Sequence, residues 1–217
     1  MFARGAQTLD MQMKGNGLQI AAFGFVMPFD YGDLPQSYSE AAHYLPLFDH
    51  NGQSTALPVG THNPKTTTIE TYTSRAPVKL GANADADYGF NFTQNADGDD
   101  LTGIDDEDGI SDETLNNITL KTTSLDVTAS NSSDRTAYIL AWIDHKQSGV
   151  FDYTDELVIT NNAVPAGSQD VVRTLSLPND LKAGQYYALR VRIGSGTTHQ
   201  DNSLAALDGE VEDYRIY

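Results

Sequence analysis

The chain has 217 residues, enough to bury the core of one large all-β domain or of two small domains. Its 30 acidic and 13 basic residues give a formal net charge of -17, which disfavours nucleic acid and anionic membrane surfaces as partners. No apolar run approaches the roughly 20 residues that span a bilayer, so we expect no membrane insertion. Because the chain contains no cysteine, disulfides and zinc–thiolate sites are excluded.

The first expected element in chain order is an apolar, β-prone strand at residues 17–28, followed by turn-forming residues at 30–35. We interpret residues 1–29 as a leading strand or joining segment. The first residues lack the basic start and apolar run of a signal peptide, so we expect the export signal elsewhere in a longer parent protein. Residues 36–66 show no sustained period and predict an irregular excursion with one short helix at 39–44.

Alternation of apolar and polar residues then returns and predicts short strands separated by turns rich in Gly, Asn and Asp. The expected strands are residues 67–73, 118–127, 136–143, 157–160, 171–177, 186–193 and 211–217. This series predicts an all-β fold, an antiparallel β-sandwich.

Carboxylates are concentrated in the acidic loop, residues 97–113, which reads DGDDLTGIDDEDGISDE. Its candidate metal ligands are Asp97, Asp99, Asp100, Asp105, Asp106, Glu107 and Asp108, with Asp85 and Asp87 just upstream. Two carboxylates about 4 Å apart repel by roughly 4 kcal/mol at an effective dielectric of about 20, so a compact loop needs a cation. Hard oxygen ligands on a flexible loop favour calcium, and this many carboxylates predict several ions.

A solvated, disordered acidic loop is the alternative interpretation of residues 97–113. We favour a calcium-binding loop because Ile104 and Ile110 alternate with the acids and would anchor it. Its glycines would also permit the tight turns that aim several oxygens at one point.

A second, weaker candidate loop follows the expected strand at residues 136–143. Asp144 and Gly149 occupy the first and sixth positions of an EF-hand-type loop, and Asp152 is a further candidate ligand. However, Lys146 and Ser148 stand where oxygen ligands are wanted, and an ammonium competes with a bound cation. A simple hairpin turn is therefore the preferred interpretation of this segment.

Glu210 directly precedes the expected strand at 211–217, which contains Glu212 and Asp213. Strand alternation places Glu210 and Glu212 on one face, roughly 7 Å apart, and Asp213 on the other. The preceding strand places Arg190 and Arg192 on one face. Antiparallel pairing would set these arginines against the glutamates, in ion pairs of about 0.2–1 kcal/mol each. All three acids are also candidate metal ligands, and for the glutamates we leave both roles open.

Catalytic patterns are weak. Asp106 and Asp108 could serve glycoside hydrolysis, but dense acidic clusters more commonly bind metal. Ser195, His199 and Asp201 are close in sequence, yet no nucleophile-elbow pattern surrounds them. We therefore expect a binding module and not an enzyme.

Three separated segments, DYGDLP at residues 30–35, GDDLTGIDDEDGI at 98–110 and GEVEDY at 209–214, together resemble the GEVED domain family. The resemblance implies that residues 30–217 form a GEVED-like β-sandwich that binds ligands, and it adds Asp30 and Asp33 to the candidate metal ligands. Such domains occur in large secreted and surface-attached bacterial proteins, and similar modules of RTX adhesins bind ligands through calcium. An extracellular, calcium-dependent adhesin module for cell-surface attachment or biofilm formation is therefore expected.

The resemblance also implies a peptide or protein ligand on another cell surface, whose free carboxylate a bound calcium can coordinate. That arrangement suits an acidic protein, which holds an anionic ligand only where a cation neutralises the site. A glycan ligand is the alternative, and a calcium-stiffened structural extender is a third reading. We expect a monomeric module within a larger chain.

Overall fold

The structure is a computed structural model that describes residues 29–45, 77–84, 87, 91–98, 106–159, 162–195 and 205–216. Its strands are β1 (Phe29–Tyr31), β2 (Ala42–Tyr44), β3 (Val78–Leu80), β4 (Ser124–Asn131), β5 (Ala137–Ile143), β6 (Ala163–Val164), β7 (Ser168–Ser176), β8 (Tyr187–Gly194), β9 (Ala205–Ala206) and β10 (Glu210–Ile216). The helical elements within these residues are the 3-10 turn η1 (Gln36–Tyr38) and the helix α2 (Asp112–Asn116). None of the described helices is long and apolar enough to cross a membrane.

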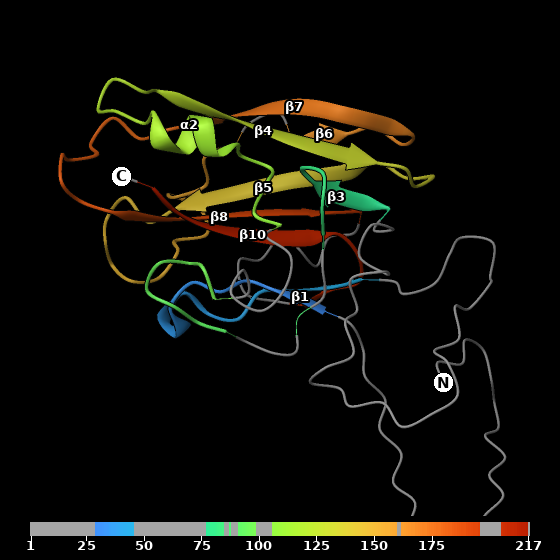
Figure 1. Cartoon of the computed structure of the whole chain (residues 1–217), viewed down its shortest axis with the longest axis horizontal. Coiled ribbons are helices and arrows are strands. Elements are labelled where there is room, and N and C mark those ends of the chain that lie inside the picture. The colour runs from blue at the N-terminus through green and yellow to red at the C-terminus, as the bar shows by residue number, and fades with distance from the viewer. Residues whose placement is uncertain are drawn as a thin grey trace, which may run out of the picture.

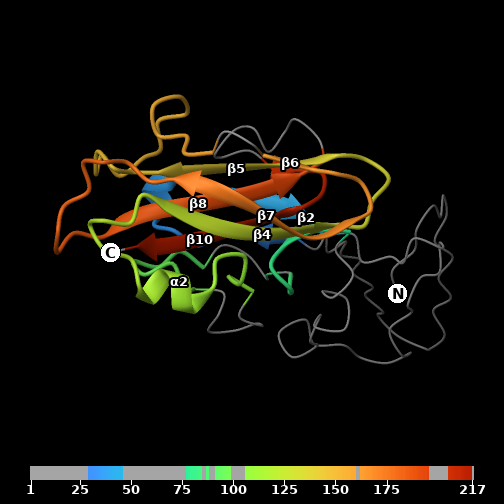
Figure 2. The same ribbon diagram turned by 90° about the horizontal axis from the view of Figure 1, so that it is seen from above.

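The strands form three sheets that stack in layers (Figure 1). The central sheet has the order β10-β8-β5-β6 and is antiparallel throughout. The antiparallel sheet β3-β4-β7 covers one side of it, and in the view from above β4 and β7 lie over β5, β8 and β10 (Figure 2). The fold is therefore the all-β sandwich expected from the sequence.

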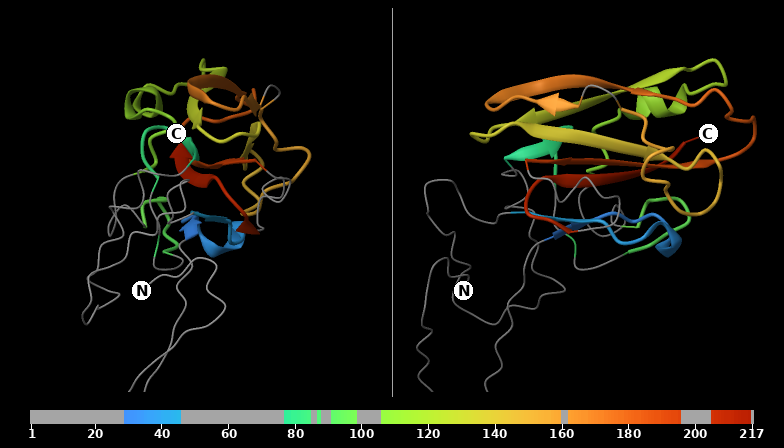
Figure 3. Two further views of the ribbon diagram at one scale, coloured as in Figure 1. Left: turned by 90° about the vertical axis from the view of Figure 1, so that its right-hand side faces the viewer. Right: turned by 180° about the vertical axis from the view of Figure 1, so that it is seen from behind.

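A small third layer, β1-β2-β9, lies against the other face of the central sheet, as the side and rear views show (Figure 3). Within it, β1 and β2 are antiparallel, whereas β2 and β9 run parallel. Because it has a layer on each side, the central sheet buries both faces, and every residue of β8 is buried.

The main core fills the space between the two larger sheets. Alternate residues of β8, Leu189, Val191 and Ile193, point into it together with Ile139 of β5 and Leu125 of β4. Each such side chain contributes about 1.5–3 kcal/mol by leaving water, so this interface carries most of the stability. A smaller cluster with Trp142 at its centre packs on the opposite face of the central sheet.

The strands expected around β5, β7, β8 and β10 are confirmed, with ends that differ by a few residues. The expected helix at residues 39–44 is wrong, because Ala42–Tyr44 forms β2 and pairs with both β1 and β9. The expected strand at 118–127 begins only at Ser124. The described part of the expected strand at 157–160, residues 157–159, contributes isolated bridges at Leu157 and Ile159.

The residues before β4 hold the helix α2, which the alternation pattern missed. Ser111 caps it by accepting a hydrogen bond from the Thr114 backbone N–H at 3.3 Å, and Asp112 and Glu113 fill its first turn. The strands expected at 17–28 and 67–73 lie outside the described residues, as does nearly all of the proposed leading segment 1–29.

Candidate metal centre

The candidate centre is built on β10, which is hydrogen-bonded to β8 as the last strand of the central sheet. The register sets Glu210 opposite Ile193 and Glu212 opposite Val191. Both glutamates therefore share the face that points toward the main core, and both are buried. The expectation that they share a face opposite to Asp213 is confirmed by this register.

The expected pairing of arginines with glutamates is wrong. Asp213 is the residue opposite Arg190, and the two form a fully buried, two-pronged ion pair with both N–O distances at 2.7 Å. Asp213 also accepts a hydrogen bond from the Leu34 backbone N–H at 3.0 Å. The antiparallel register brings these two side chains together on the face away from the main core, so the carboxylate that we expected to bind metal is engaged by an arginine.

Arg192 lies on the same face as Arg190 and is also buried. Its Nε donates to His43 Nε2 at 2.9 Å, and His43 Nδ1 donates to the Asp208 carbonyl at 2.7 Å. With Nε2 as acceptor and Nδ1 as donor, His43 is a neutral imidazole fixed in one tautomer. This side of the sheet is thus closed by internal contacts with β2.

Glu212 is held in place by the segment that ends the acidic loop. Its Oε1 accepts hydrogen bonds from the backbone N–H of Gly109 at 2.9 Å and of Asp108 at 3.2 Å. Its Oε2 accepts one from the Tyr214 hydroxyl at 2.6 Å, and that hydroxyl accepts one from the Ile110 N–H at 3.0 Å. A Cβ at position 109 would lie 2.4 Å from Glu212 Oε2, so only glycine permits this close approach.

Glu210 is less well supported than Glu212. Its Oε2 accepts a hydrogen bond from the Leu80 backbone N–H of β3 at 2.8 Å. Its Oε1 is buried without a hydrogen-bond partner in the described structure. A buried acceptor without a partner costs about 1–3 kcal/mol, and more when it is charged, so a further ligand at this atom would be favourable.

Other carboxylates act on this pair through their charge. Burial raises the pKa of Glu210 well above its ordinary value, and the charges of Glu212, Asp30 and Asp106 raise it further. Burial also raises the pKa of Glu212, to which the charges of Asp108 and Asp106 add. Asp30 is fixed beside the strand because its Oδ2 accepts a hydrogen bond from the Val211 N–H at 2.7 Å.

The residues present fit a hard cation better than a soft metal. A cation would supply the missing contact to Glu210 Oε1 and cancel the repulsion that raises both glutamate pKa values. All the candidate donors are oxygens, which calcium and magnesium prefer. Among the described residues, no three such side chains are gathered closely enough to hold a metal ion.

Other predicted ligands accept hydrogen bonds from neighbouring segments. Asp108 accepts hydrogen bonds from the Ala82 N–H and the Asn83 side-chain amide, each at 2.8 Å. Asp97 accepts one from the Thr93 hydroxyl at 2.8 Å. These side chains shape the loops around β10.

Two further predicted ligands tie the loops to the small sheet. Asp87 accepts from the Tyr31 N–H at 2.7 Å and forms a bridge with Phe29 of β1. Asp33 is buried and accepts from the Gly98 N–H. Glu107 is half-buried. The remaining predicted ligands, Asp85, Asp99, Asp100 and Asp105, lie outside the described residues.

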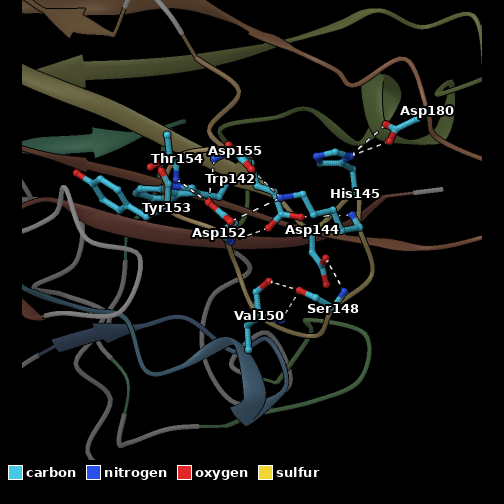
Figure 4. Close-up of polar contacts among 12 residues, drawn as sticks. Trp142, Asp144, His145, Ser148, Val150, Asp152, Tyr153, Thr154, Asp155 and Asp180 are labelled. Atoms are coloured by element: carbon cyan, nitrogen blue, oxygen red, sulfur yellow. Dashed lines mark hydrogen bonds and ion pairs between the residues drawn. The ribbon is translucent and has the colours of Figure 1, made fainter.

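The weaker candidate loop lies at the end of β5, at residues 144–156. A hairpin turn is the interpretation that the sequence favours for this segment. Trp142 and Leu157 form a bridge that closes it. Asp144 and Asp152 each accept backbone N–H bonds from their own loop, and the close-up shows these contacts (Figure 4). They are separate from the contacts of Glu210 and Glu212.

Sequence reasoning missed the groups that position Glu212. Tyr214 follows it by two residues on the same strand face, and strand alternation contained that signal. The N–H groups of Gly109 and Leu80 come from segments remote in sequence. Their approach depends on how β3 and the acidic loop pack, which no local pattern encodes.

The comparisons with known proteins bear on one part of the chain. The family model of the GEVED domain matches residues 138–217, which include the loop 144–156, β8 and the glutamates of β10. No curated protein and no solved structure matches the chain significantly.

Proposed function

We propose that this chain is a calcium-dependent ligand-binding module of the kind found in bacterial RTX adhesins, and that its ligand is a peptide. One observation carries the proposal. Glu210 is fully buried beside Glu212 on β10, with an unpartnered oxygen and with a pKa raised by burial and by neighbouring carboxylates. A divalent cation would resolve this unfavourable arrangement.

Glu210 and Glu212 would hold the ion, with Asp106 as the third candidate because its charge acts on both glutamates. When bound, calcium would supply positive charge and open coordination positions for an anionic group of the ligand. The chain's own residues keep Glu212 oriented through Gly109 and Tyr214. Extracellular calcium modules typically bind at about 0.1–1 mM, which suits a secreted surface protein.

A surface hollow on the opposite face of the central sheet from Glu210 and Glu212 would offer a ligand a second contact region. The hollow has a volume of about 90 Å³ and is lined by Leu34, Pro35, Tyr38, Gln94, Tyr186, Tyr187, Ala188 and Arg215. Tyr186 is half-exposed, and the Arg215 guanidinium lies 3.9 Å from the centre of its ring. Tyrosine and arginine are enriched among the residues that dominate the binding energy of protein interfaces.

The test is a binding screen on peptide and glycan arrays, each run with millimolar calcium and with EGTA. We expect calcium-dependent binding to peptides with a free carboxylate and weak binding to the same peptides as amides. Binding to glycans alone would redirect the proposal to the glycan ligand. Binding that persists in EGTA, or no binding to either array, would contradict a calcium-bridged ligand.

A further inference from the structure

The loop 144–156 has the spacing of a calcium loop, yet its buried acids are already satisfied. Asp144 is buried, with only 1% of the residue exposed to solvent. Its Oδ1 accepts a hydrogen bond from the Ser148 N–H at 2.9 Å. Its Oδ2 accepts one from the Gly149 N–H and one from the Tyr38 hydroxyl, each at 2.8 Å. Both carboxylate oxygens are thus occupied by donors of the protein.

Glu156 closes the other end of the loop in the same way. It is buried, and its Oε2 accepts a hydrogen bond from the Asp152 N–H at 2.6 Å. Its Oε1 accepts one from the Lys146 N–H at 3.3 Å. Asp152 in turn accepts from the backbone N–H groups of Thr154 at 3.0 Å and Asp155 at 2.9 Å (Figure 4). Asp144, Glu156 and Asp152 therefore each accept hydrogen bonds from backbone N–H groups of the loop.

The Lys146 side chain supplies the positive charge of this loop. Its ammonium Nζ lies 3.1 Å from Asp155 Oδ2 and 3.6 Å from Asp152 Oδ2. The hydrogen bond with Asp155 raises the pKa of Lys146, and the charges of Asp155, Asp152 and Glu156 act in the same direction. Lys146 stands at the third position of the EF-hand-type spacing, which normally provides an oxygen ligand.

We infer that Lys146 is the residue that determines cation specificity in this loop: its tethered ammonium replaces a divalent ion and keeps calcium out. The loop is therefore ordered with or without calcium. The physical reason is that an ammonium among the acids repels an entering cation. This inference does not depend on calcium binding at Glu210 and Glu212.

Trp142 offers a local signal for the test, because it is the only tryptophan of the chain. It is buried at the base of the loop, its Nε1 donates to the Tyr153 carbonyl at 3.4 Å, and the two rings lie 6.3 Å apart. Its fluorescence emission therefore reports on the loop. The measurement should use the full chain carrying Glu210→Gln and Glu212→Gln, so that calcium at β10 does not contribute.

In that background, we expect Trp142 emission to be the same in EGTA and in 10 mM calcium. Adding Lys146→Asn should create a saturable calcium response with a dissociation constant of about 0.1–1 mM. Lys146→Arg, which keeps the positive charge, should remain unresponsive. The inference is overturned if the parent already responds to calcium, if Lys146→Asn does not respond, or if Lys146→Arg responds as Lys146→Asn does.

Discussion

The loop 144–156 and the glutamate pair of β10 handle buried negative charge in opposite ways. In the loop, Asp144 and Glu156 each accept two or more hydrogen bonds, and the ammonium of Lys146 lies beside the neighbouring acids. On β10, Glu210 accepts one hydrogen bond for two oxygens, and neither glutamate has an ion-pair partner in the described part of the chain. The first region is complete as it stands, whereas in the second a buried glutamate oxygen lacks a hydrogen-bond partner, which is why we propose a cation there.

Among the described residues, the acids of the dense run and those of β10 differ in their hydrogen bonding. Residues 97–113 hold the densest run of carboxylates, yet Asp97 and Asp108 accept hydrogen bonds from neighbouring loops. The strongest candidate ligand, Glu210, lies in a strand where acids alternate with other residues. Its Oε1 is buried without a hydrogen-bond partner, and burial is a property of the packed sheets.

The largest expected effect comes from breaking the closed face of the central sheet. Arg190→Met leaves the Asp213 carboxylate buried without its partner, so we expect a loss of about 3–5 kcal/mol in the free energy of unfolding. Urea denaturation measures it. Because this face does not belong to the metal site, the loss should be equal in calcium and in EGTA. A loss confined to calcium would place Asp213 in the metal site and break the comparison.

A smaller effect is expected at the hydroxyl that orients Glu212. Tyr214→Phe removes a donor to Glu212 and an acceptor for the Ile110 N–H, at a cost of about 1–3 kcal/mol, and should weaken calcium binding. Tyr187→Phe is a matched control. The Tyr187 hydroxyl also accepts a hydrogen bond from a backbone N–H, that of Lys182, but it donates to the Gln185 side chain and not to a glutamate. It should destabilise the fold without changing the calcium dissociation constant. Equal calcium affinities in both variants would contradict the role of Tyr214.

The pH dependence of stability should differ between the calcium-free and calcium-bound protein. The pKa of Glu210 is raised in the folded state, so the calcium-free fold binds a proton more tightly than the unfolded chain does. Its stability therefore falls as the pH rises from the ordinary glutamate pKa through the raised value. Acidification within this window should therefore raise the melting temperature in EGTA. Glu210→Gln should reduce this gain, as should saturating calcium. If the variant and the wild type show the same pH dependence in EGTA, the raised pKa is not responsible.

The smallest effect is expected in the exposed part of the loop. Asp155→Asn removes the closest partner of the Lys146 ammonium, but the pair is largely exposed, so the free energy of unfolding should fall by no more than about 1 kcal/mol. The fall should shrink in high salt and should not depend on calcium. A strong calcium dependence would mean that the loop holds an ion after all.

Much of the fold followed from the sequence because strand alternation is a local signal. It placed β5, β7, β8 and β10 and predicted that Glu210 and Glu212 share a face. It could not give the register, and the register decides that Arg190 lies opposite Asp213. The helix expected at 39–44 failed for a related reason, since β2 is stabilised by strands remote in sequence.

The site itself was predicted only as a set of residue types. The motif around β10 contained both glutamates, but their environment comes from Leu80 on β3 and Gly109 at the end of the acidic loop. The helix α2 could have been found from the sequence, because Ser111 followed by two acids is a recognisable N-terminal signal.

The central claim is that calcium binds at Glu210 and Glu212, and a thermal melt tests it most directly. Wild-type protein, the double variant Glu210→Gln with Glu212→Gln, and the control Glu113→Gln in an exposed turn of α2 are melted in EGTA and in calcium. At calcium 100-fold above the dissociation constant, the wild type and the control should gain about 2.7 kcal/mol, or roughly 5–10 °C. The double variant should gain little and should melt above the wild type in EGTA, because its buried charges are gone. An undiminished calcium gain in the double variant would contradict the claim.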